Sequence, residues 1–119
     1  MIGKTNAVSG GGAELRSQIV TSGYHIDATG TGTRSFDLSL TGLQPKQLYS
    51  CVLNPGDGAI SASGMSLSSP DIKQGTCFKL PFSTNMYCCQ FIPLKENLTL
   101  TVSWQRTGGT VTRTDYAVF

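Results

Sequence analysis

The chain has 119 residues, and glycine (14), threonine (14) and serine (13) together supply 41 of them. Charged residues make up 13% of the chain, about half the usual share, which is too few for several long amphipathic helices with charged faces. The net charge of +2 comes from basic residues scattered along the chain. Because nucleic-acid binding needs a basic stripe with interleaved aromatic residues, the charge pattern argues against a nucleic-acid partner.

The N-terminal segment, residues 1–13, is rich in glycine and has no periodic pattern. We interpret it as a flexible or partner-docked arm ahead of a single domain over residues 14–119. The segment lacks the apolar centre of a secretory signal peptide, and no stretch approaches the roughly 18 apolar residues that span a bilayer. The sequence therefore predicts synthesis in the cytoplasm without a signal peptide, and no membrane insertion.

From residue 14 onward, short segments alternate apolar and polar residues, and turn residues separate these segments. A period of two is typical of β-strands that bury one face. The clearest example is residues 97–105, in which the apolar positions are Leu98, Leu100, Val102 and Trp104. The expected strands, in chain order, are residues 14–20, 23–29, 34–40, 47–53, 59–67, 76–82, 86–92, 97–105 and 110–119.

Residues 14–20 are also the best candidate for a short helix, and residues 68–75 are expected to form a loop. The segments 76–82 and 86–92 are expected to pair as a hairpin about the turn between them. About eight or nine short strands with no long helix predict an all-β fold, either an antiparallel β-sandwich or a small jelly roll.

One corner between two expected strands carries a recognisable motif. Leu43, Pro45 and Tyr49 form an L-x-P-x-x-x-Y arrangement, which resembles the E-to-F corner of fibronectin type III and related immunoglobulin-like sandwiches. The resemblance implies that Leu43 closes one end of the core, that Pro45 stiffens the turn, and that the Tyr49 hydroxyl bonds back to the corner backbone. This is a structural role, because a sandwich fold alone implies no function.

The N-terminal sequence MIGKTNAVSGGGA is similar to the N-termini of small structural proteins of bacteriophages and prophages from gut bacteria. This resemblance implies a virion component, such as a tail, fibre or capsid accessory protein at the particle surface. Its expected partners are other virion or assembly proteins and further copies of itself. In such assemblies an N-terminal arm often docks on a neighbouring subunit.

Catalytic and metal-binding patterns are weak, so we predict a chain that is not an enzyme and has no cofactor. The single histidine, His25, shares a strand face with Asp27, and we expect an exposed histidine beside a carboxylate. Asp37 and Asp115 are distant carboxylates that nothing in the sequence brings together. The turn at residues 54–58 lacks the alternating carboxylates of a calcium loop.

Four cysteines are present, and they lack the CxxC spacing of a metal site. In a chain made in the cytoplasm we expect buried free thiols, although the sequence alone leaves every pairing open. The four positions are Cys51, Cys77, Cys88 and Cys89.

An alternative function is a ligand- or carbohydrate-binding module of the adhesin type, at a tail tip or cell surface, with a host-surface glycan as partner. Exposed aromatic rings would supply the binding surface. The phase of Trp104 places it with core residues, which leaves Tyr24 and Tyr116 as the freer aromatic residues. The two tyrosines do not identify a sugar site, so the ligand-binding residues stay unassigned.

Overall fold

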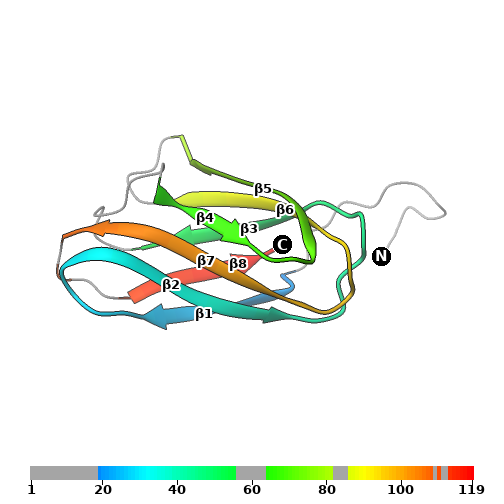
Figure 1. The fold of residues 1–119 in the computed structure, drawn as a ribbon, viewed down its shortest axis with the longest axis horizontal. Helices are drawn as coiled ribbons and strands as arrows, with labels where there is room; N and C mark the ends of the chain where they lie inside the picture. Colours follow the sequence, from blue (N-terminus) through cyan, green and yellow to red (C-terminus); the bar gives the residue numbers. More distant parts are fainter. Residues whose placement is uncertain (1–18, 56–63, 82–85, 109, 111–112) are drawn as a thin grey trace.

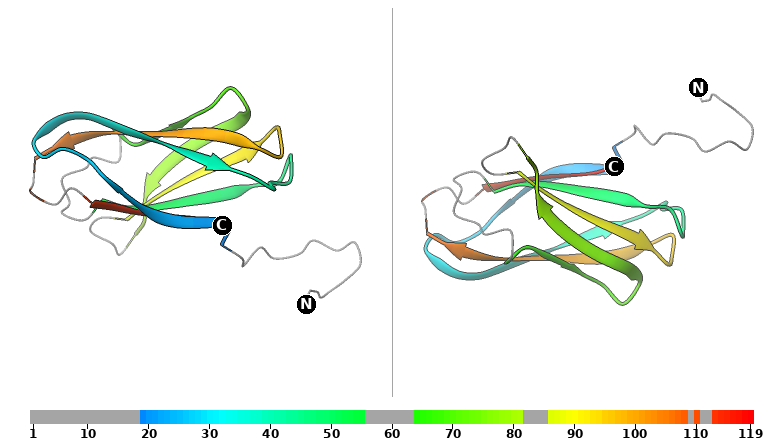
Figure 2. Two further views of the ribbon diagram at one scale, coloured as in Figure 1. Left: turned by 90° about the horizontal axis from the view of Figure 1, so that it is seen from below. Right: turned by 90° about the horizontal axis from the view of Figure 1, so that it is seen from above.

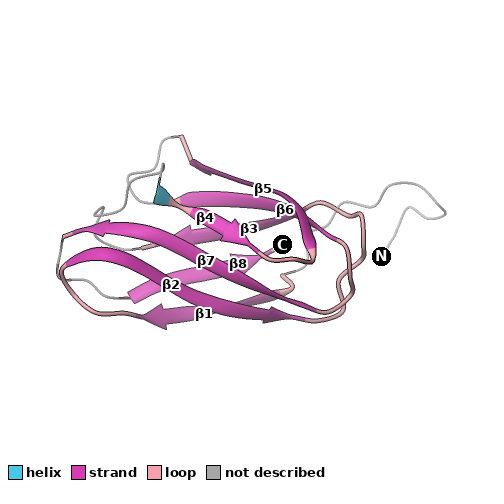
Figure 3. Ribbon diagram, in the orientation of Figure 1, coloured by secondary structure: helices cyan, strands magenta, loops and turns pink. Residues whose placement is uncertain are grey.

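The computed structural model describes residues 19–55, 64–81, 86–108, 110 and 113–119, and within them the chain forms strands and no α-helix (Figures 1 and 3). The predicted arm at residues 1–13 lies outside the described residues. The strands are β1 (Thr21–Ile26), β2 (Thr31–Leu40), β3 (Tyr49–Asn54), β4 (Ser66–Ser68), β5 (Ile72–Lys79), β6 (Tyr87–Pro93), β7 (Leu98–Thr107) and β8 (Arg113–Val118).

The strands form two antiparallel sheets that pack as layers (Figure 2). The five-stranded sheet has the order β1-β8-β3-β6-β5, and the three-stranded sheet has the order β2-β7-β4. The predicted all-β sandwich is therefore confirmed. The pairs β1 with β8, β2 with β7 and β3 with β6 are nested within one another, and β4 lies beside β5. A jelly roll has the same nested pairs, but there the fourth and fifth strands pair with each other, whereas here β5 pairs with β6 in the five-stranded sheet.

The core lies between the two sheets, as the period-two pattern predicts. The inward residues of β7 are all buried, and they alternate with outward residues that are exposed or half-buried. Phe36 packs against the core from β2, while Tyr49, Cys51 and Leu53 contribute from the centre of the five-stranded sheet. Trp104 is 1% exposed, so its predicted place in the core is confirmed.

The predicted hairpin of β5 and β6 is present, but the predicted loop at residues 68–75 is wrong at its C-terminal end. Strand β5 begins at Ile72, because Ile72 pairs with Pro93 and Lys73 with Ile92 across β6. A bulge follows between Lys73 and Thr76. A Cβ atom at Gly75 would lie 3.1 Å from the carbonyl oxygen of Leu67, so glycine permits the close approach of β5 to β4.

Other strand boundaries also differ from the expectation. The expected strand at 14–20 falls mostly outside the described residues, and Ile19 and Val20 precede β1 without being part of a strand. Of the expected strand at 59–67, the described part forms only the short strand β4. Strand β8 is internal to its sheet, between β1 and β3, so the C-terminal strand does not form a sheet edge.

Candidate functional site

The corner residues lie together at one end of the sandwich. Leu43 is buried in the core, Pro45 is exposed, and the Gln44 backbone N–H donates a hydrogen bond of 2.7 Å to the Tyr49 hydroxyl. The Leu43 backbone N–H donates to the carbonyl oxygen of Glu96 at 2.9 Å, which fixes the corner to the β6–β7 turn. The corner is thus a bonded structural element that orients β3 in the centre of its sheet.

His25 differs from the sequence expectation, because it is half-buried between the sheets rather than exposed. Its ring stacks on Phe36 with 4.5 Å between ring centroids, and it meets the Trp104 ring edge-on at 6.3 Å. The Tyr116 ring also packs on Phe36, with 5.6 Å between the ring centroids. The alternation of β1 turns His25 inward, where these rings from β2, β7 and β8 form an aromatic cluster.

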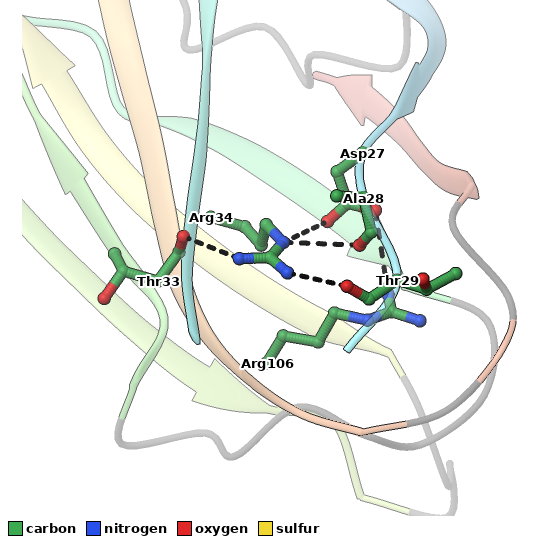
Figure 4. Close-up of polar contacts among 6 residues, drawn as sticks. All are labelled: Asp27, Ala28, Thr29, Thr33, Arg34 and Arg106. Atoms are coloured by element: carbon green, nitrogen blue, oxygen red, sulfur yellow. Dashed lines mark hydrogen bonds and ion pairs between the residues drawn. The ribbon is translucent and has the colours of Figure 1, made fainter. Parts of the chain in front are cut away.

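Asp27 lies beyond this cluster and is held by two arginines (Figure 4). Its carboxylate oxygens lie 3.6 Å from Arg106 Nη1 and 3.8 Å from Arg34 Nε, and its side chain is only 5% exposed. Among the described residues these oxygens accept no hydrogen bond, so the ion pairs alone compensate their burial. Arg34 also donates to the carbonyl oxygens of Ala28, Thr29 and Thr33, which closes the turn between β1 and β2. Asp27 is therefore paired with arginines and acts as a structural group.

The other carboxylates that the sequence analysis considered are far apart in the fold. Asp37 faces outward from the three-stranded sheet and accepts a hydrogen bond of 2.8 Å from the Thr101 hydroxyl. Asp115 faces outward from the five-stranded sheet and pairs with Arg113 at 2.9 Å. The two carboxylates thus lie on opposite outer faces of the sandwich and do not form a pair.

The part of the chain that the structure describes contains neither a metal-binding cluster nor a membrane-spanning helix. Within it, no group of three or more histidine, cysteine and acidic side chains is placed to hold a metal ion. No helix of the described residues is long and apolar enough to cross a membrane.

The expectation of four free thiols is wrong for two of the cysteines. Cys77 on β5 and Cys89 on β6 are directly paired in the strand register, and they form a disulfide. Cys51 and Cys88 are free and buried. Burial raises the pKa of the Cys51 thiol from 9.0 to about 12, and the nearby Cys88 thiol adds to the rise. The disulfide thus fixes the edge strand β5 to its sheet, while Cys51 behaves as a small apolar side chain.

The two outer faces of the sandwich have contrasting chemistry. On the three-stranded sheet, the outward residues from the middle of the strands carry hydroxyl, carboxyl or amide groups: Thr33, Ser35, Asp37, Ser39, Thr99, Thr101, Ser103, Gln105, Ser66 and Ser68. On the five-stranded sheet, one residue of each strand aligns in a row that crosses the whole sheet: Ser22, Ala117, Val52, Cys88 and Phe78. Four residues of this row are apolar. We call the row, together with Tyr24 and Ile26 of β1, the apolar face; polar outward residues border the row, with Ser50 and Gln90 on one side and Asn54 and Asp115 on the other.

The apolar face has further exposed hydrophobic residues and a shallow hollow. Tyr24 and Ile26 of β1 are 57% and 55% exposed, and Phe78 at the opposite edge is 40% exposed. The hollow has a volume of about 220 Å³, and its lining residues are Val52, Asn54, Met86, Asp115, Tyr116 and Ala117. An outer sheet face normally carries polar residues, so this face is the candidate functional site.

This face is not among the sequence predictions, although the sequence contains part of the signal for it. The segments around Val52 and Cys88 are continuous apolar runs, whereas a sheet with one solvated face would show polar residues at alternate positions. Whether Val52 and Cys88 lie side by side in one row depends on the strand register, which the sequence alone does not determine.

Of the aromatic residues considered for sugar binding, only Tyr24 is exposed. Tyr116 is half-buried against Phe36, and the Arg113 guanidinium lies 4.1 Å from the centroid of the Tyr24 ring. One face of the Tyr24 ring is therefore already covered by an arginine.

Comparison of the chain with family models, curated proteins and solved structures finds no match.

Proposed function

We propose that this chain is a non-catalytic structural subunit of a phage-like particle, such as a tail, fibre or capsid accessory protein, which binds neighbouring subunits through its apolar face. The observation that carries the proposal is the row across the five-stranded sheet, which is apolar on four of the five strands and lies opposite a sheet whose outward residues are polar. Burial of such a row against a protein partner is favourable, whereas its exposure to water promotes aggregation.

Two further observations support the same function. Jelly rolls, which share the nested strand pairs of this chain, are common in viral capsid domains, although they also occur in lectins. The N-terminal sequence is similar to that of small phage structural proteins, in which an arm ahead of the domain docks on a neighbour. The fold and the arm are compatible with either a surface-mounted or an internal subunit of the particle.

The proposal is tested on particles isolated by density gradient from cells that express the chain at its natural level. We expect the chain to sediment with the particles. A Val52→Lys variant places a charge at the centre of the apolar face, and we expect it to remain in the soluble fraction. Ser103→Lys is the matched control, because Ser103 is a half-buried outward residue of the opposite sheet.

Two results would contradict the proposed function. The first is a wild-type chain that stays in the soluble fraction while the particles sediment. The second is equal incorporation of Val52→Lys and Ser103→Lys, which would show that the apolar face is not the contact surface. Retention of the purified chain on immobilised host glycans would instead favour the adhesin alternative.

A further inference from the structure

Among the strands that the structure describes, four lie at sheet edges, and they differ in how well they are protected from pairing with other strands. An unprotected edge presents unpaired backbone N–H and C=O groups that bind another strand, so soluble proteins block edges with charges, bulges, prolines or short strands. Strand β5 carries Lys73, Lys79, a bulge and a disulfide to its neighbour. Strand β4 has three residues and lies against β5.

Strand β1 has none of these protections. It pairs with β8 in an unbroken register from Thr21 to Ile26, and β8 is its only partner among the described strands. It contains no proline, lysine, arginine or carboxylate, and its one basic side chain, His25, points inward onto Phe36. Its outward residues Tyr24 and Ile26 are both more than half exposed. The edge therefore has a regular register, no lysine, arginine or carboxylate of its own, and two exposed hydrophobic side chains; the one charged group on it is the Arg113 guanidinium over the Tyr24 ring.

Strand β2, the remaining edge, is long but carries Asp37 among outward serines and threonines. A partner strand at β2 would bring its side chains next to a carboxylate and a polar surface. Comparison of the four edges thus selects β1 as the site of strand addition.

The charges near β1 indicate which partner fits. The closest charged side chains on the outer face, Arg113 and Asp115, are paired at 2.9 Å and neutralise each other. A second copy of this edge therefore meets no like-charge repulsion, and it offers the same apolar residues. Antiparallel pairing of two β1 strands about a two-fold axis perpendicular to the sheet also places both apolar faces on the same side.

We propose that two copies of this chain dimerise by antiparallel pairing of their β1 strands, which joins the five-stranded sheets into one ten-stranded sheet with a continuous apolar face. This inference deepens the proposed function, because it rests on the apolar face as a surface for further subunits. The dimer would double the width of the surface that each docking event buries.

The test is the solution mass of the purified full chain by sedimentation equilibrium. We expect twice the mass of one chain for wild type and at least about a tenfold weaker dimer for Tyr24→Lys, because two ammonium groups would face each other near the axis. Leu94→Lys is the control, since Leu94 is similarly exposed (51%) but follows β6, away from β1. It should remain a dimer. Circular dichroism checks that each variant is folded.

Hydrogen exchange separates strand pairing from side-chain association. Alternate amides of Thr21–Ile26 should exchange more slowly in the wild-type dimer than in Tyr24→Lys, because half of the edge N–H groups point away from β8. A wild-type monomer, or a dimer without this protection, would overturn the inference. If the chain is a monomer but still sediments with particles, the dimer is refuted and the proposed function is not. If the chain is a dimer but is absent from particles, the proposed function is refuted and the dimer is not.

Discussion

At the scale of single residues, burial determines the chemistry of the Cys51 thiol. Its pKa rises from 9.0 to about 12 in the folded chain, chiefly because burial disfavours the thiolate. This shift contributes to the free energy of unfolding. The contribution is fully present below about pH 9 and is lost as the pH rises toward about 12, because only the thiol of the unfolded chain ionises in that range. Between about pH 8 and about pH 10.5, the free energy of unfolding of the wild type should fall by about 2 kcal/mol more than that of Cys51→Val, which has no thiol at this position.

Urea unfolding at both pH values measures this difference. Thr99→Val serves as a control, because Thr99 is exposed and has no thiol. An equal loss of stability in wild type and Cys51→Val would show that the Cys51 thiol does not control the alkaline behaviour.

Also at the residue scale, the buried carboxylate of Asp27 and the exposed carboxylate of Asp115 provide a direct comparison. Replacement of Asp27 by Asn removes the anion beside the buried Arg106 guanidinium, and we expect it to lower the free energy of unfolding by about 3 kcal/mol. Asp115→Asn breaks a pair whose side chains are 56% and 53% exposed, so its effect should stay below about 1 kcal/mol. Equal effects in thermal or urea unfolding would contradict the structural role of Asp27.

At the scale of elements, the Tyr49 hydroxyl contributes a hydrogen bond to the corner before β3, next to the bond from the Gly42 N–H to Asn97 Oδ1. Tyr49→Phe removes the acceptor of the Gln44 N–H and should lower the free energy of unfolding by about 1–3 kcal/mol. Tyr24→Phe is the matched control, since the Tyr24 ring is exposed on the outer face. If both variants unfold at the same denaturant concentration as wild type, the corner bond contributes nothing to stability.

The same elements show which parts of the fold the sequence predicts. The corner and the core face of β7 are local patterns, so Tyr49 and Trp104 could be placed from the sequence alone. The Cys77–Cys89 disulfide could not be predicted in the same way. A hairpin symmetric about Thr84 would oppose Cys77 to Phe91, whereas the observed register opposes Cys77 to Cys89. A two-residue shift leaves every side chain on the same face, so the alternation of apolar residues cannot detect it.

The candidate site depends on contacts between residues that are even farther apart in the sequence. Asp27 directly follows β1 and Arg106 lies in β7, far along the chain, so no local pattern signals their pairing. The apolar face likewise arises only when β8, β3 and β6 lie side by side in one register. The sequence therefore predicts the layers of the sandwich but not the chemistry of its outer faces.

At the scale of the whole molecule, one outer face of the sandwich is polar and the other carries the apolar row, and we propose that only the apolar face is covered in the assembly. Two exposed aspartates report on these faces separately. Asp115 lines the hollow at the border of the apolar face and forms an ion pair with Arg113. Asp37 lies on the polar face and accepts a hydrogen bond from the Thr101 hydroxyl. Carbodiimide labelling of carboxylates, followed by mass spectrometry, compares their accessibility.

The decisive measurement is this labelling, carried out on the purified chain at low concentration and on the chain within isolated particles. We expect both aspartates to react in the purified chain. In the particle, Asp115 should become protected while Asp37 continues to react. Equal reactivity of the two carboxylates in the particle, or protection of Asp37 alone, would contradict the assignment of the apolar face as the interaction surface.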